Sequence, residues 1–176
     1  HERFARRLVG VAEATNDDRF LAIGHNFLGW IARQRGDLRW ARAHLERAVE
    51  GHRAMRNEAE EAFARIAYGA TLTDLGDYAA ARRSYARQLE IARRLKQSWT
   101  EAQAYNDLGV LERRIGDPGK AVEYFRRGYE GLRARGETPD ALGALDNLAL
   151  AELDLGRAEN ARDLARQGIA ICERRG

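Results

Sequence analysis

Cysteine and long apolar runs are scarce in this 176-residue sequence, and each shortage excludes a class of structure. The single cysteine, Cys172, rules out an internal disulfide, which suits a reducing compartment. No run of about 18 apolar residues is present, so the sequence predicts no membrane span. No signal peptide is visible, and these absences together predict a cytoplasmic location.

The sequence also has no strong excess of one charge sign, and it lacks the residue sets of known catalytic sites. The 30 Lys and Arg residues are interleaved with 27 Asp and Glu residues, which indicates a solvated helical surface. Paired arginines such as Arg82-Arg83 diverge by roughly 100° around a helix, so they form no single basic stripe and predict no nucleic-acid partner.

No glycine-rich phosphate loop is present, and His44 and His52 are spaced too widely for the i, i+4 pair of a metal site. His25 is expected to be a partly buried packing residue. Cys172 is expected to be an inert residue on the inner stripe of the last helix. The sequence therefore predicts neither an enzyme nor a cofactor or metal site.

What the sequence does contain is a repeat. Glycines stand at 36, 76, 116 and 156, a period of 40 without slippage. A fixed period of this length is typical of an array of supersecondary units. We expect one domain over 1–176, cut from a longer array, with the following parts: a half-repeat at 1–17 and repeats at 18–57, 58–97, 98–137 and 138–176.

Each repeat is predicted to form two helices, and only two prolines interrupt a helix-favouring composition. The periodic glycine ends the first helix in a left-handed conformation, and the following aspartate caps the second. Asn57 with Glu60 and Ser98 with Glu101 are spaced like capping boxes, and Thr138-Pro139 is a typical helix start. Arg157 replaces the aspartate in the last repeat, so that helix lacks its cap.

Small and large residues also recur in register around the glycine. Seven residues before it the sequence has Gly29, Gly69, Gly109 and Ala149. Nine residues after it stand Leu45, Tyr85, Phe125 and Ala165. Five residues after it stand Ala41, Ala81, Ala121 and Ala161. Small residues at these two levels allow the two helices of a hairpin to come close, and we expect the large residues beside them to fill the gap.

These residues resemble the tetratricopeptide repeat family. The family pattern is matched by Tyr68-Gly69, Gly76-Asp77-Tyr78, Ala81 and Tyr85, and again by Leu108-Gly109, Gly116-Asp117, Ala121 and Phe125. The 40-residue period is longer than the usual ~34. It is similar to kinesin-light-chain and LGN-type scaffolds and to arrays of bacterial multidomain regulators. The resemblance implies an all-α fold, a right-handed superhelical solenoid of antiparallel hairpins.

The resemblance also implies that the first helices line a concave face that binds a protein or peptide. It places Asn26, Trp30, Arg33, Asn106, Arg113 and Asp146 on that face as candidate binding residues, together with Ile66, Ala70, Thr73, Val110, Leu150 and Leu153. Asparagine could bond a peptide backbone, arginine a carboxylate, and tryptophan could serve as an apolar anchor.

Two functions follow. The first is a non-catalytic peptide-binding scaffold, and the resemblance to the arrays of bacterial multidomain regulators implies that it is part of such a regulator. The excess of arginine over lysine and the abundant alanine suggest a bacterial source. The alternative is self-association, as a homo-oligomer through uncapped ends, or an intramolecular sensor arm with no separate ligand.

Overall fold

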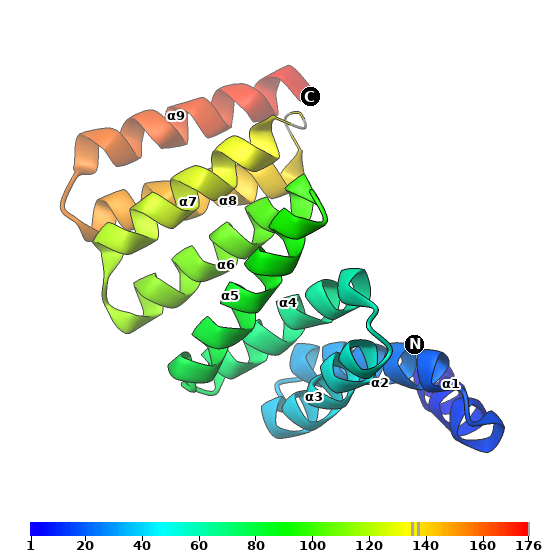
Figure 1. The fold of residues 1–176 in the computed structure, drawn as a ribbon. Coiled ribbons are helices and arrows are strands. Elements are labelled where there is room, and N and C mark those ends of the chain that lie inside the picture. The colour runs from blue at the N-terminus through cyan, green and yellow to red at the C-terminus, as the bar shows by residue number, and fades with distance from the viewer. Residues whose placement is uncertain (135, 137, 176) are drawn as a thin grey trace. The chain divides into compact units, whose positions relative to one another are not determined.

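The computed structural model describes residues 1–134, 136 and 138–175, and these residues form nine α helices and no strand (Figure 1). The helices are α1 (Glu2–Thr15), α2 (Asp18–Gln34), α3 (Leu38–Ala54), α4 (Glu58–Asp74), α5 (Tyr78–Arg94), α6 (Ser98–Ile115), α7 (Pro118–Arg133), α8 (Pro139–Asp154) and α9 (Ala158–Arg175). The predicted all-α architecture is confirmed.

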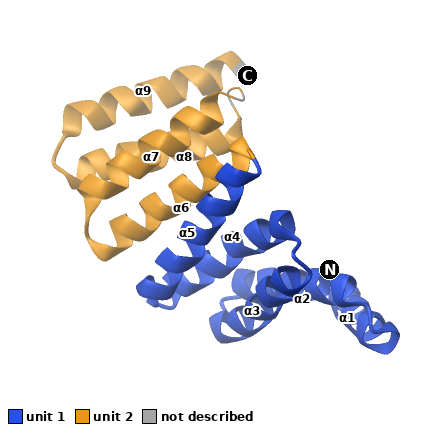
Figure 2. Cartoon of the chain, in the orientation of Figure 1, with its two compact units in different colours: residues 1–95 blue, residues 96–176 orange. Residues whose placement is uncertain are grey.

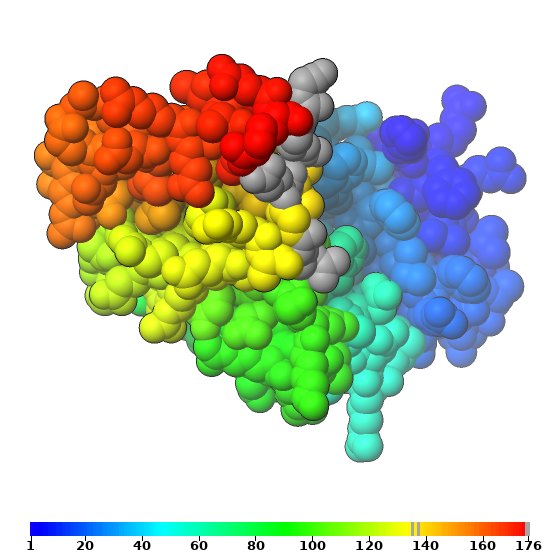
Figure 3. All heavy atoms as spheres, turned by 90° about the horizontal axis from the view of Figure 1, so that it is seen from above, coloured from blue at the N-terminus to red at the C-terminus, as the bar shows by residue number. Residues whose placement is uncertain are grey.

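The chain divides into two compact units, residues 1–95 and 96–176 (Figure 2). In the first unit α1 to α5 pack each on the next, and α2 also contacts α4. In the second unit α6 to α9 do the same, and α6 contacts α8; the atoms of α9 lie directly against the preceding helices in the space-filling view (Figure 3). One continuous domain over 1–176 stays a prediction.

The helix ends follow a period of 20 residues, half the repeat. A residue with positive φ follows each of the helices α1 to α8, and these residues include the predicted glycines, with φ of 73–95°. The other junctions use Asn16, Arg56 and Lys96, with φ of 55–56°, and Gly136 at 113°. A left-handed conformation costs an ordinary residue roughly 1–2 kcal/mol, so the side-chain types of Arg56 and Lys96 did not reveal these stops, whereas asparagine adopts this conformation readily.

The predicted aspartate caps are confirmed. The Oδ1 atoms of Asp37, Asp77 and Asp117 accept hydrogen bonds from backbone N–H groups three residues later at 3.2, 3.2 and 3.0 Å. These bonds satisfy donors that a helix start leaves free. Thr138 caps α8 in the same way at 3.3 Å.

The two predicted capping boxes are wrong in different ways. Asn57 Oδ1 accepts from the Glu60 N–H at 3.4 Å, but the Asn57 N–H donates to the His52 carbonyl at 2.9 Å, so the box is only half formed. Ser98 is the first residue of α6, and the cap position belongs to Gln97, whose side chain makes no capping bond. The left-handed Lys96 sets this register, because the cap follows it directly, as Asn57 follows Arg56.

The predicted packing of large on small residues is confirmed within the hairpins. A Cβ atom on Gly29, Gly69 or Gly109 would lie 2.4–2.6 Å from a side-chain carbon of the residue 16 positions later. Those residues, Leu45, Tyr85 and Phe125, are almost completely buried. The last pair, Ala149 and Ala165, is looser, and Ala165 is exposed.

The core is a series of clusters between successive helices, which is how a repeat array buries its apolar faces. In the second unit one cluster joins Phe125 of α7 to Leu148 and Ala151 of α8. Another joins Tyr129 and Leu132 of α7 to Leu145 of α8 and Ile171 of α9. Equivalent clusters in the first unit join α2, α3 and α4. The first helices α2, α4, α6 and α8 therefore keep one face outside these clusters.

Candidate binding surface

The first helices of neighbouring repeats are joined by polar bonds between residues 41 positions apart. Arg33 donates to Asp74 at 2.9 Å between α2 and α4, and Arg113 donates to Asp154 at 2.5 Å between α6 and α8. Between α6 and α8, the Asn147 amide also donates to Asn106 at 3.1 Å, and the Trp99 indole donates to Asp140 at 3.0 Å. The constant offset sets the lateral register of each helix pair.

These bonds between first helices change the roles expected of three candidate residues. Arg33 and Arg113 already pair with a carboxylate of the next repeat, and Asn106 already accepts an amide bond. A peptide carboxylate would therefore have to compete with Asp74 or Asp154 for these guanidinium groups. The sequence did not show this, because each partner lies on another helix.

The remaining candidates differ in accessibility. In the first unit Trp30 is 51% exposed and Asn26 is half-buried. In the second unit Asp146 is exposed, and so are the predicted groove residues Leu150 and Leu153. Thr73, placed on the groove by resemblance, is buried, and its hydroxyl donates to the Gly69 carbonyl at 2.9 Å, so it cannot meet a ligand.

Sequence reasoning missed an apolar stripe on α2. Phe20 and Phe27 are each about half exposed, as is Trp30, and their spacing of seven and three residues puts them on one helix face with the half-buried Ile23. We call Phe20, Ile23, Phe27 and Trp30 the aromatic stripe. The spacing was visible in the sequence, but the opposite face of α2 is also largely apolar, which obscured it.

Phe63 of α4 extends this surface. It is 52% exposed, and the 41-residue offset of the Arg33–Asp74 bond puts it level with Ala22 along the pair of helices. Large apolar side chains are therefore exposed on both α2 and α4, two helices that contact each other. Contiguous exposed apolar surface of this kind marks an interaction site more often than scattered single residues do.

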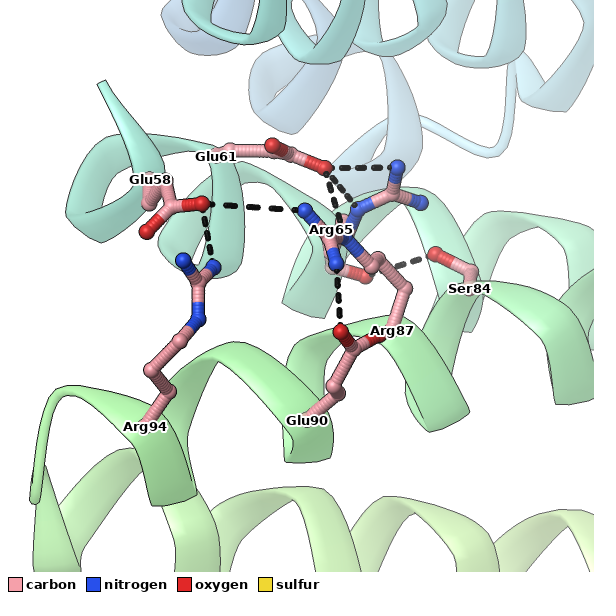
Figure 4. Close-up of polar contacts among 7 residues, drawn as sticks. All are labelled: Glu58, Glu61, Arg65, Ser84, Arg87, Glu90 and Arg94. Atoms are coloured by element: carbon pink, nitrogen blue, oxygen red, sulfur yellow. Dashed lines mark hydrogen bonds and ion pairs between the residues drawn. The ribbon is translucent and has the colours of Figure 1, made fainter. Parts of the chain in front are cut away.

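A network of ions joins α4 to α5 on another part of the first unit (Figure 4). The buried Glu61 carboxylate accepts from Arg65 at 2.8–2.9 Å and lies 3.6 Å from Arg87. Arg87 also pairs with Glu90 at 2.8 Å, and that hydrogen bond is the main reason its pKa is raised. Glu61 is thus a single buried acid that orients two arginines.

A histidine pair joins α2 to α3. The Nδ1 atoms of His25 and His44 lie 2.8 Å apart, which requires one ring to donate and the other to accept. His25 is buried, so its prediction as a packing residue is confirmed. Burial, followed by the nearby charges of His25, Arg47 and Arg6, lowers the pKa of His44 to about 4. Both rings are therefore neutral at pH 7.

We expect acid to destabilise the first unit through this pair. The pKa of His44 is about 4 in the folded chain and 6.5 when unfolded, so its contribution is complete above pH 6.5 and is lost as the pH falls toward 4. Allowing for partial exposure, the loss is about 1–3 kcal/mol. Urea unfolding of the wild type and of His44→Phe at several pH values measures it. Parallel pH profiles for the two proteins would contradict the assignment, because other groups, including His52, titrate equally in both.

The described residues show no metal-binding cluster. Within residues 1–134, 136 and 138–175, no group of three or more His, Cys, Asp or Glu could hold a metal ion. Over the same residues, none of the helices combines the length and the apolar character that crossing a membrane requires. Cys172 is exposed, so its placement on the inner stripe is wrong; Ile171 takes the buried position on α9.

Most of the sequence matches models of one protein family. Two family models, both described as tetratricopeptide repeat, match residues 60–134 and 141–175, together more than half of the chain. The chain belongs to the tetratricopeptide repeat family, as its repeat pattern indicated. No curated protein matches it as a relative.

Solved structures of low identity share the fold. BtubC (BKLC) from P. vanneervenii has a TM-score of 0.79 at 20% identity, over 89% of this chain and 65% of that one. A kinesin-light-chain-like protein of Podosopora anserina, with nearly identical TPR-like repeats, has a TM-score of 0.76 at 18% identity, over 98% and 86%. A Rap protein solved with Competence and Sporulation Factor has a TM-score of 0.74 at 17% identity, over 88% of this chain and 41% of that one. The predicted helical repeat solenoid is confirmed.

Proposed function

We propose that this chain is a non-catalytic scaffold module that binds a polypeptide on the exposed face of α2 and α4. The observation that carries the proposal is the aromatic stripe of α2, and the exposed Phe63 of α4, also a first helix, supports it. The family membership supports it, as does the Rap protein of the same fold that was solved with Competence and Sporulation Factor.

The surface favours a segment with apolar side chains. Trp30 is a large, rigid anchor of the type that dominates binding energy at interfaces. Asn26 lies four residues earlier on α2 and makes no side-chain hydrogen bond within the described part of the chain, so its amide can bond a peptide backbone. Arg33 adds a charge at the end of this surface, already balanced by Asp74. An acidic ligand is therefore less favoured than an apolar one.

The experiment selects peptides from a random display library against the whole chain and measures their affinity by fluorescence anisotropy. We expect the selected peptides to be rich in apolar residues and to bind Trp30→Ala at least about tenfold more weakly, the loss of one modest hot spot. Phe4→Ala is the matched control, because Phe4 is an exposed aromatic residue of α1 outside the stripe. Affinities unchanged by both Trp30→Ala and Phe27→Ala would move the site elsewhere.

We also propose that the module works in the cytoplasm as part of a larger bacterial regulator. The abundance of arginine and alanine supports a bacterial source. In the second unit, Asn106, Arg113 and Asp146 would contribute to the ligand surface of that assembly. Sequencing the complete gene tests the regulator context: an adjoining nucleotide-binding or helix-turn-helix domain supports it, and a gene without any further domain contradicts it.

Self-association is a second candidate, favoured by the exposed apolar face of α1. Phe4 and Val11 are 67% and 60% exposed, and they line a shallow cleft with Leu8, Arg3 and Arg7. Sedimentation velocity over a range of concentrations tests it. A dimer that Phe4→Glu dissociates supports the proposal, and a monomer at high concentration contradicts it.

A further inference from the structure

A cleft of about 540 Å³ on the first unit is lined by four arginines and no acid. It is formed by three successive helices, and none of its residues belongs to the aromatic stripe. Its lining is Arg53 of α3, Arg65 and Tyr68 of α4, and Ala80, Arg83, Ser84 and Arg87 of α5.

The inner arginine of this cleft is held in place from behind. The Arg65 side chain is only 13% exposed, and both its Nε and one terminal nitrogen bond the same oxygen of buried Glu61 (Figure 4). A guanidinium group has five N–H donors in a rigid plane, so the other donors remain for a ligand. Glu61 therefore acts as a positioning residue that fixes the orientation of Arg65.

The outer arginines are not neutralised. Arg53 and Arg83 are exposed, and neither has an ion-pair or hydrogen-bond partner in the described ranges of the chain. Arg87, by contrast, pairs with Glu90 and lies near Glu58 and Glu61. After these pairs are counted, Arg53 and Arg83 remain unpaired, while the Glu46 carboxylate beside Tyr68 of the lining lowers the net positive charge of the cleft.

Two hydroxyl groups complete the lining. Tyr68 donates to Glu46 at 3.2 Å, and burial, followed by the charge of Glu46, raises its pKa, so the phenol stays protonated. The Ser84 hydroxyl makes only a long bond of 3.5 Å to the Arg65 carbonyl. Ser84 is almost completely buried, so it forms part of the wall of the cleft and is not one of its exposed donors.

We propose that this arginine cleft binds a phosphate monoester group. Such a group carries about −1.5 to −2 charges at pH 7 and three acceptor oxygens, which matches two unpaired arginines and a third of fixed orientation. A guanidinium group can donate to two phosphate oxygens at once. A single carboxylate has only two oxygens, which is too few for three arginines to bind in this way. The group belongs either to a free small molecule or to a phosphorylated side chain.

Calorimetric titration of the whole chain at low ionic strength tests the proposal, with inorganic phosphate, O-phospho-L-serine and L-serine as probes. We expect both phosphate probes to bind and L-serine not to bind. Equal affinity for the two shows that the phosphate group alone is recognised, whereas preference for phosphoserine points to a modified side chain. Absence of binding by both would overturn the proposal.

A pair of double variants separates a site from diffuse charge attraction. Arg53→Gln/Arg83→Gln removes the two unpaired charges and should weaken binding at least about tenfold. Arg39→Gln/Arg47→Gln removes the same charge from exposed positions of α3 outside the cleft and should leave the affinity nearly unchanged. Equal weakening by both double variants would overturn the proposal. All four side chains are exposed, so both variants should fold.

Discussion

Replacing Phe125 with alanine is expected to lower the free energy of unfolding by about 3–5 kcal/mol. Phe125 is completely buried, packs against Leu148 and Ala151 of the next repeat and covers Gly109 of its own hairpin. The truncation removes apolar contact and leaves a cavity between two repeats. Urea unfolding followed by circular dichroism measures the change.

The pairing with Gly109 gives this prediction a sharper form. Gly109→Ala alone should destabilise the chain by about 1–3 kcal/mol, because its Cβ would lie 2.6 Å from the Phe125 ring. On the Phe125→Ala background the same substitution should be neutral or stabilising, since alanine favours a helix over glycine by about 1 kcal/mol. A double-mutant cycle measures this coupling, and additive effects would show that the two residues do not share one contact.

Replacing Glu61 with alanine is expected to cost about 3–5 kcal/mol, the range for breaking a buried ion pair by removing one partner. Its carboxylate is almost inaccessible, and among the described residues it is the one carboxylate that pairs with Arg65, whose own side chain is mostly buried. Without it, Arg65 loses its counter-charge inside the α4–α5 hairpin. Thermal and urea unfolding measure the loss.

Glu90→Ala is the matched control for this substitution. Glu90 also binds Arg87, at 2.8 Å, but its side chain is well exposed. Exposed ion pairs contribute little to stability, so the unfolding midpoint should hardly move. Similar shifts for Glu61→Ala and Glu90→Ala would mean that burial does not decide the strength of this network.

The local part of the fold was predictable because it depends on neighbouring residues. Asp77 caps α5 through a backbone N–H three residues away, and Gly76 ends α4 with a φ of 78°. Both effects act within one turn of chain. Arg56 and Lys96 adopt the same conformation as Gly76 with residue types that do not favour it. Their residue types give no sign of this conformation, so only the structure reveals it.

The candidate surface was predictable in part. The repeat register placed Trp30 at an exposed position of α2, as expected of a binding residue. It did not show that Arg33 faces Asp74, because that contact depends on how far one helix slides along the next. The same limitation hid the arginine cleft, whose residues come from three helices.

By itself the sequence determined the repeat, its period, the helix starts and the large-on-small packing inside each hairpin. These depend on short-range backbone bonding and on residue volumes, which a periodic pattern displays directly. Only the tertiary structure decided which charges neutralise one another and which aromatic side chains remain exposed. Those outcomes depend on distances between helices about 20 to 40 residues apart in the chain, where each side chain has several possible partners and packing selects one.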